Sequence, residues 1–112
     1  METRDLKKLV HFSDQRVERE AVYETLRLWS EVVCLSRAQT LGPVRDDDSD
    51  AMFLVVAGEG AFQVDGRRKR LKQWGTALVP AGAEVVVSNA SVDPLVLLVT
   101  AAPPPVPREV TG

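Results

Sequence analysis

The stretch DAMFLVVAGEGAFQVDG, residues 50–66, contains the clearest structural signals in this sequence. Its first half, residues 51–57, is a short apolar run that follows several aspartates and ends at Gly58. A run of this length with β-branched and aromatic residues predicts a buried strand rather than a helix. The Asp65-Gly66 pair that closes the stretch is typical of a tight β-hairpin. The stretch therefore predicts a fold built from short strands.

The same pattern continues towards the C-terminus. A polar segment returns from the hairpin over residues 67–74, and short apolar segments follow at residues 76–79, 85–87 and 95–100. Turn-forming residues separate them about every 8 to 12 residues, a spacing that is typical of all-β barrels and sandwiches. We therefore predict an all-β fold.

The first third of the chain is harder to assign. Apolar residues recur at helical spacing between residues 22 and 33, which suits an amphipathic helix. The aromatic and β-branched residues of the same segment favour strands instead. We expect two strands, at about residues 16–24 and 27–36, and keep a helix as the alternative. A short helix or an extended arm is expected near residues 4–9.

The length of 112 residues predicts a single domain. We place its barrel core at about residues 16–101 and a proline-rich tail at residues 102–112. Because proline lacks the amide donor and fixes its own φ, this tail is expected to run extended, near polyproline II. A tail with so little intrinsic order is expected to dock on its own barrel or on a partner chain.

The bulk composition excludes several classes of partner. With 14 basic and 16 acidic residues the net charge is −2, so we expect no nucleic-acid partner and no membrane partner. The longest apolar run, residues 51–57, is far too short to span a membrane. Cys34 is the single cysteine, and the N-terminal residues show no signal-peptide pattern. These features predict a cytoplasmic, reducing location.

Two segments, DAMFLVVAGEGAFQVDG (50–66) and WGTALVPAGAEVVVSN (74–89), resemble the cupin superfamily, in particular its small conserved-barrel members. Gly58 matches the closing glycine of the first family motif, and Pro80, Gly82 and Asn89 match the second motif at the right spacing. The resemblance covers about residues 36–101. It implies a cupin-type double-stranded β-helix, the RmlC-like jelly-roll barrel.

The metal chemistry of that family is not matched. The family's ligands are three histidines and a glutamate, and the resemblance places them at Val44, Asp46, Ala51 and Val85, or at Arg45 and Asp47 for the first two. Ala51 and Val85 have no donor atom, and the only histidine, His11, lies outside both motifs. Because transition metals need several converging nitrogen or oxygen donors, we expect no metal and no cofactor.

Two charged clusters have a structural and a functional interpretation. The aspartates of residues 46–50 are interpreted as a solvated loop at the barrel rim, with a calcium or magnesium site as the alternative. The basic run at residues 67–72 is interpreted as a solvated strand face, with phosphate or nucleic-acid binding as the alternative.

Strand alternation places Ala51 and Phe53 on one inward face and Val85 and Asn89 on another. We also include Tyr23 and Trp29 among the expected pocket residues, because an aromatic ring that carries a hydroxyl or N–H group suits a pocket. Asp46 is included because its loop is expected at the barrel mouth. The residues predicted to line a ligand pocket are thus Tyr23, Trp29, Asp46, Ala51, Phe53, Val85 and Asn89. The pattern is compatible with an open or a filled interior.

The sequence favours a metal-free cupin-like barrel that is structural or binds a small apolar or amphipathic molecule, with no catalytic residue assigned. The alternative is a cupin-type enzyme, isomerase or dioxygenase-like, with an irregular site of Asp46, Asp50 and Asn89. Residues 51–57 and 95–99 are apolar on both strand faces, which requires cover on both sides. A second copy would supply that cover, and small cupins commonly dimerise, so we expect a homodimer.

Overall fold

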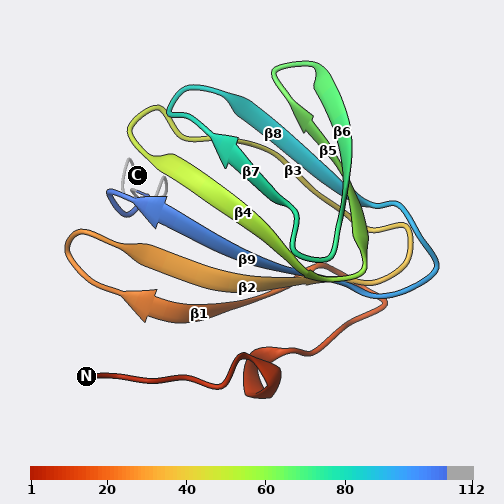
Figure 1. The fold of residues 1–112 in the computed structure, drawn as a ribbon, viewed down its shortest axis with the longest axis horizontal. Coiled ribbons are helices and arrows are strands. Elements are labelled where there is room, and N and C mark those ends of the chain that lie inside the picture. The colour runs from red at the N-terminus through yellow and green to blue at the C-terminus, as the bar shows by residue number, and fades with distance from the viewer. Residues whose placement is uncertain (106–112) are drawn as a thin grey trace.

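The computed structural model describes residues 1–105, and the expected extended course of residues 106–112 lies outside them. The described residues form a short 3-10 helix and nine strands (Figure 1). In chain order these are η1 (Leu6–Leu9), β1 (Glu18–Glu24), β2 (Trp29–Leu35), β3 (Thr40–Arg45), β4 (Asp50–Ala57), β5 (Glu59–Val64), β6 (Arg67–Lys72), β7 (Thr76–Val79), β8 (Glu84–Asn89) and β9 (Leu95–Ala102).

The strands form two antiparallel sheets that face each other. One sheet has five strands in the order β1-β2-β9-β4-β7, and the other has four in the order β3-β8-β5-β6. Neighbours such as β9 and β4, or β3 and β8, are far apart in sequence, which is the long-range pairing of a jelly roll. The predicted all-β jelly-roll fold is confirmed.

The ambiguous first third folds as two strands. β1 and β2 pair with each other, and β2 pairs along its whole length with β9. Pairing with a central strand outweighs the helical spacing of the apolar residues, so the helical alternative for residues 16–36 is wrong. The short helix expected near residues 4–9 is present as the 3-10 helix η1, capped by the Asp5 side chain. No helix within residues 1–105 is long and apolar enough to cross a membrane.

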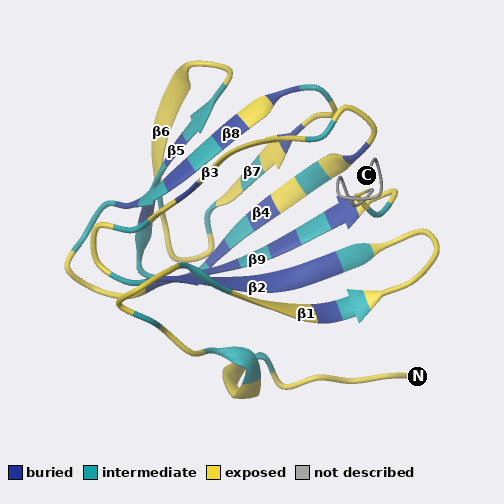
Figure 2. Ribbon diagram, turned by 180° about the vertical axis from the view of Figure 1, so that it is seen from behind, coloured by how far each residue is buried: buried dark blue, intermediate teal, exposed yellow. Residues whose placement is uncertain are grey.

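The core lies between the two sheets, where the buried faces of β2, β4, β9 and β8 meet (Figure 2). Phe53 and Phe62 pack edge to face at its centre, with ring centroids 5.9 Å apart. The largest fully buried side chains of this core are Leu35, Leu95, Leu97, Val33, Val55 and Val87. Side chains thus fill most of the barrel interior.

Gly58 ends β4 with a φ of +85°, a conformation that favours glycine. A Cβ at this position would also collide with the backbone carbonyl of Pro94, in the turn before β9. Both constraints explain why the predicted turn needs glycine at this position.

Candidate functional site

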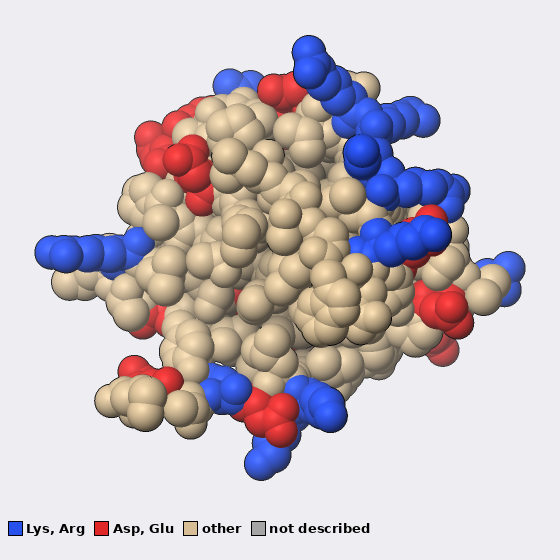
Figure 3. Space-filling view, viewed as in Figure 1, with Lys and Arg blue, Asp and Glu red and all other residues tan. Residues whose placement is uncertain are grey.

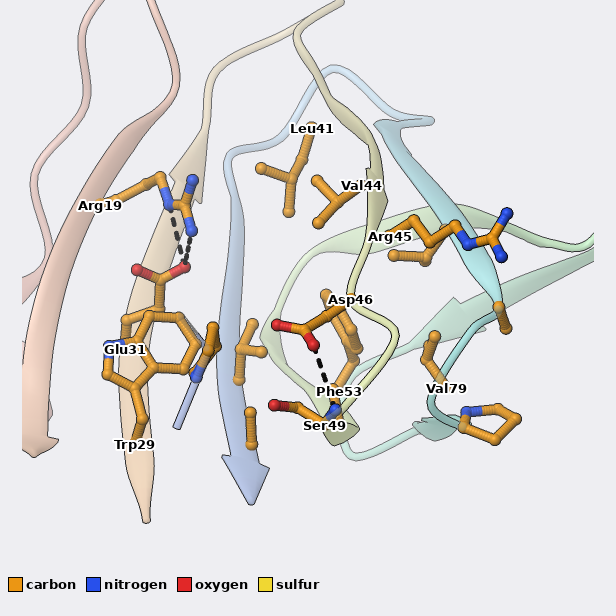
Figure 4. Close-up of a pocket in the computed structure, with 17 residues that line it drawn as sticks. Arg19, Trp29, Glu31, Leu41, Val44, Arg45, Asp46, Ser49, Phe53 and Val79 are labelled. Carbon is orange, nitrogen blue, oxygen red and sulfur yellow. Dashed lines mark hydrogen bonds and ion pairs between the residues drawn. The ribbon is translucent and has the colours of Figure 1, made fainter. Parts of the chain in front are cut away.

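A cavity of about 200 Å³ lies between the sheets at one end of the barrel (Figure 4). It is bounded where β2, β4 and β8 begin and where β3, β7 and β9 end. Its lining residues are Arg19, Trp29, Glu31, Leu41, Val44, Arg45, Asp46, Ser49, Ala51, Phe53, Val79, Pro80, Ala83, Val85, Val99, Ala101 and Pro105. The interior is therefore filled at one end and open at the other.

The walls of this cavity are mainly apolar because of strand register. Trp29 pairs with Ala101 across β2 and β9, and Ala101 in turn pairs with Ala51 of β4. The two alanines leave space beside the half-buried Trp29 ring, while Phe53 closes the cavity towards the core. A row of small side chains between two aromatic ones thus accounts for the space.

An ion pair between a buried carboxylate, Glu31, and a half-exposed guanidinium, Arg19, faces the same cavity. The Glu31 side chain is only 8% exposed, and its Oε1 accepts hydrogen bonds from Nε and Nη2 of Arg19 at 2.9 and 2.6 Å. Glu31 opposes Ala21 in the register of β1 and β2, so Arg19, two residues earlier on β1, lies diagonally across from it. Burial raises the pKa of the Glu31 carboxyl above its ordinary value, although the Arg19 guanidinium opposes this effect.

Sequence reasoning missed both members of this pair. The available signal was Glu31 itself, an isolated acid in the otherwise uncharged strand WSEVVCL. A carboxylate in such a strand needs a partner if it is buried. The partner was not evident, because Arg19 lies in the alternating polar segment that forms β1.

The rim of the cavity is shaped by the loop between β3 and β4. Asp46 Oδ1 accepts backbone N–H bonds from Asp48 and Ser49 at 2.9 and 3.1 Å, which closes a turn. Ser49 is buried, and its hydroxyl donates to the carbonyl of Pro103. The part of the tail that the structure describes therefore docks on its own barrel. β9 runs through Ala102, so this tail begins one residue later than predicted.

Five of the seven predicted pocket residues line this cavity: Trp29, Asp46, Ala51, Phe53 and Val85. Tyr23 does not, because a bulge in β1 turns it towards the N-terminal segment. There its hydroxyl donates to the carbonyl of Glu2 at 3.2 Å, and the Arg4 guanidinium lies 4.9 Å from its ring centroid. Tyr23 therefore lies outside this cavity, which corrects its predicted place in a pocket.

Asn89 also lies away from the cavity, at the opposite end of β8 from Val85. It is buried, and its Nδ2 donates to the carbonyls of Leu35 and Asp93 at 3.0 and 2.9 Å. Its Oδ1 accepts the N–H of Ser91 at 3.0 Å. These bonds satisfy the amide completely in a structural role, which corrects its predicted place in a pocket.

The two charged clusters occupy the surface. Asp50 accepts the N–H of Ala81 at 2.8 Å, and Asp47 pairs with Arg45. In the part of the chain that the structure describes, no group of three or more His, Cys, Asp or Glu side chains converges as a cation site would require. In β6 the four residues 67–70 and Lys72 are exposed, as expected of a solvated strand face.

The family's metal positions do surround one space, because Val44, Asp46, Ala51 and Val85 all line the cavity. Only Asp46 has an oxygen donor, and its Oδ1 is engaged in the turn. Since a transition metal needs three or four such donors, the residues present do not fit the metal that the fold family implies.

Comparison with family models and with curated proteins finds no match. Among solved structures, the chain is 30% identical to the protein TT1209 from Thermus thermophilus, with a TM-score of 0.89 over 94% of this chain and 100% of that one. It is 28% identical to an RmlC-like cupin protein from Desulfovibrio desulfuricans, with a TM-score of 0.81 over 93% and 98% of the two chains. The Cnp3 cupin domain of Schizosaccharomyces pombe shares the fold at 18% identity, with a TM-score of 0.80 over 89% and 72%.

Two facing antiparallel sheets around a mouth cavity define a small jelly-roll barrel of the cupin type. With these structural neighbours, the chain belongs to the cupin superfamily.

Proposed function

We propose that this protein is a metal-free cupin that binds a small organic molecule in the cavity at the mouth of its barrel. The observation that carries the proposal is the combination, in a single cavity, of mainly apolar walls with one ion pair whose carboxylate is buried. Ligand sites typically have this composition, with predominantly apolar walls and a few fixed polar groups that orient the ligand.

The volume limits the ligand. At about 200 Å³ the cavity is smaller than the pockets that hold drug-sized molecules. An apolar cavity of about 150 Å³ holds benzene, so a single aromatic ring or a short branched chain fits here. The Trp29 ring supplies a flat apolar surface for such a body.

The ion pair supplies the polar end of the site. Glu31 and Arg19 are held by β2 and β1, and in Figure 4 they lie on the same wall as Trp29, across the cavity from Asp46. A ligand with an apolar body and a hydrogen-bonding group at one end would satisfy both parts. This is the amphipathic ligand class expected from the sequence.

The alternative, an enzyme that uses Asp46, Asp50 and Asn89, has weaker support. Asp46 lines the cavity, but Asp50 and Asn89 do not. Both of the latter are engaged in hydrogen bonds to the backbone. The three side chains therefore form no common site in the structure.

A thermal-shift titration tests the proposal, because a ligand that binds only the native state raises the midpoint of unfolding. The probes are p-cresol, benzylamine and benzoate, each at millimolar concentration. At least one should stabilise the wild type, and Ala101→Leu should lose the shift because the added side chain fills the cavity. Lys72→Leu, at an exposed position of β6 that does not line the cavity, should retain it. No shift with any probe, or equal shifts in both variants, would refute the proposal.

The working unit in this proposal is a homodimer in the cytoplasm. The strands β4 and β9 carry apolar side chains on both faces, and a second copy of the chain would cover the outer face, which supports dimerisation. Cys34, a free and buried thiol, supports a reducing compartment.

A further inference from the structure

The outer face of the five-stranded sheet carries exposed apolar side chains at β4 and β7. Met52 is 45% exposed and Leu78 is 69% exposed, and these two residues oppose each other in the register of the two strands. Leu54, on the same face of β4, is half-buried. Figure 3 shows this face as a broad surface with few charged side chains. We call Met52, Leu54 and Leu78 the β4–β7 patch.

The other half of the same face is covered by the chain itself. Leu6, Leu9 and Val10 of the N-terminal segment pack against Val32 and Val96 of β2 and β9. This cover leaves the β4–β7 patch exposed among the described residues. Apolar strand faces are normally covered on both sides, so the exposed half is a candidate contact surface.

Charges of opposite sign flank the patch. The acidic loop, residues 46–50, precedes β4 on one side, and the basic strand β6 lies on the other (Figure 3). Arg67 and Lys69 of β6 form no ion pair in the described structure, and Asp48 forms none either. Three exposed charges near the patch are thus available to a partner.

This arrangement is complementary to itself. In a two-fold dimer the same surface is used by both subunits. If the axis runs parallel to the sheet, within the plane of the interface, and passes between the two charged regions, the patches face each other. The acidic loop of each subunit then lies opposite the basic strand of its partner, twice by symmetry.

We infer that the occupant of the β4–β7 patch is a second copy of this chain, aligned by contacts between the acidic loop and β6. This inference rests on the proposed homodimer and adds its interface and its alignment. Burial of the apolar patch stabilises the dimer, and the two charge contacts select one orientation among those that the patch allows.

A charge-swap experiment tests the alignment. In one variant Asp47 and Asp48 become lysine, and in the other Arg67 and Lys69 become glutamate. Each variant alone sets like charges opposite each other twice, so its dimer dissociation constant should rise about tenfold. An equimolar mixture forms heterodimers in which both contacts are again attractive, and it should recover dimerisation at the wild-type level. Sedimentation velocity at low ionic strength measures both, and circular dichroism checks that each variant is folded.

The outcomes separate the inference from the proposal on which it rests. A wild type that sediments near 12 kDa at micromolar concentration would overturn the homodimer itself. A dimeric wild type whose swapped variants are not restored on mixing would overturn the alignment alone. Leu78→Lys should give a monomer, and a dimer that survives this change would overturn the β4–β7 patch as the interface. Arg27→Glu, in the loop between β1 and β2, is the control and should leave the dimer unchanged.

Discussion

Replacement of Arg19 by methionine should destabilise the protein through the charge that it leaves behind. The Glu31 side chain is 8% exposed, and its Oε1 accepts two hydrogen bonds from the Arg19 guanidinium. Removing one partner of a fully buried pair costs about 3–5 kcal/mol, whereas an exposed pair contributes about 0.2–1 kcal/mol. Because the Arg19 side chain is half exposed, water screens part of the effect. We therefore expect the free energy of unfolding to fall by about 2 kcal/mol at neutral pH.

The loss should depend on pH in a defined direction. Burial raises the pKa of Glu31 above 4.5, its ordinary value, so the native state binds this proton more tightly than the unfolded state. The stability contributed by this group is present at low pH and is lost as pH rises through the native pKa. Without Arg19 the native pKa rises further, so the penalty of Arg19→Met should be smaller at pH 5 than at pH 7.5.

Urea denaturation followed by circular dichroism measures these differences. In a Glu31→Gln background no buried carboxylate remains, and Arg19→Met should cost about 0.5 kcal/mol or less. Arg27→Met, at an exposed loop position, is the control and should change stability by no more than about 0.5 kcal/mol. The interpretation of the pair would be refuted if Arg19→Met matched this control, or if its penalty were the same with and without the Glu31 carboxylate.

Three further predictions concern residues outside the cavity. Gly58→Ala should reduce the free energy of unfolding by about 2–3 kcal/mol, because the positive φ of this position is strained for alanine and the added Cβ collides with the Pro94 carbonyl. A near-neutral result in urea denaturation would contradict this prediction. Asn89→Ala should cost about 2–3 kcal/mol by leaving two carbonyls and one N–H without their partner, and a loss of probe binding without a loss of stability would instead place Asn89 in the site. Burial raises the pKa of the Cys34 thiol, so iodoacetamide should alkylate it only on unfolding; rapid labelling of the native protein, followed by mass spectrometry, would disprove this.

The fold was predictable because its signals are local. Asp65-Gly66 and Gly58 mark turns whose backbone geometry the structure shows directly, with positive φ at all three residues. The first third was ambiguous because the pairing of β2 with β9 joins residues at least 60 positions apart, and no local pattern reports it. Alternation placed Ala51, Phe53 and Val85 correctly on inward faces, since the side-chain period of a strand is two.

The polar part of the site was not predictable in the same way. The partnership of Arg19 and Glu31 depends on the diagonal register of β1 and β2. The predicted place of Tyr23 was wrong because a bulge between Ala21 and Tyr23 changes the face that it occupies. Inward-facing positions are also not equivalent along a barrel, which is why Asn89 and Val85, both inward on β8, lie at opposite ends.

At the family's metal positions this barrel has a cavity but only one side chain with an oxygen donor, Asp46, so we propose that it holds no transition metal. Elemental analysis of the protein, purified without chelators and after incubation with one equivalent each of manganese, iron, nickel, copper and zinc salts followed by desalting, tests this claim most directly. Far less than one equivalent of any of these metals per chain is predicted, because only Asp46 among the four family positions has a donor atom. One equivalent of a single transition metal, lost on replacement of Asp46 by alanine, would contradict it.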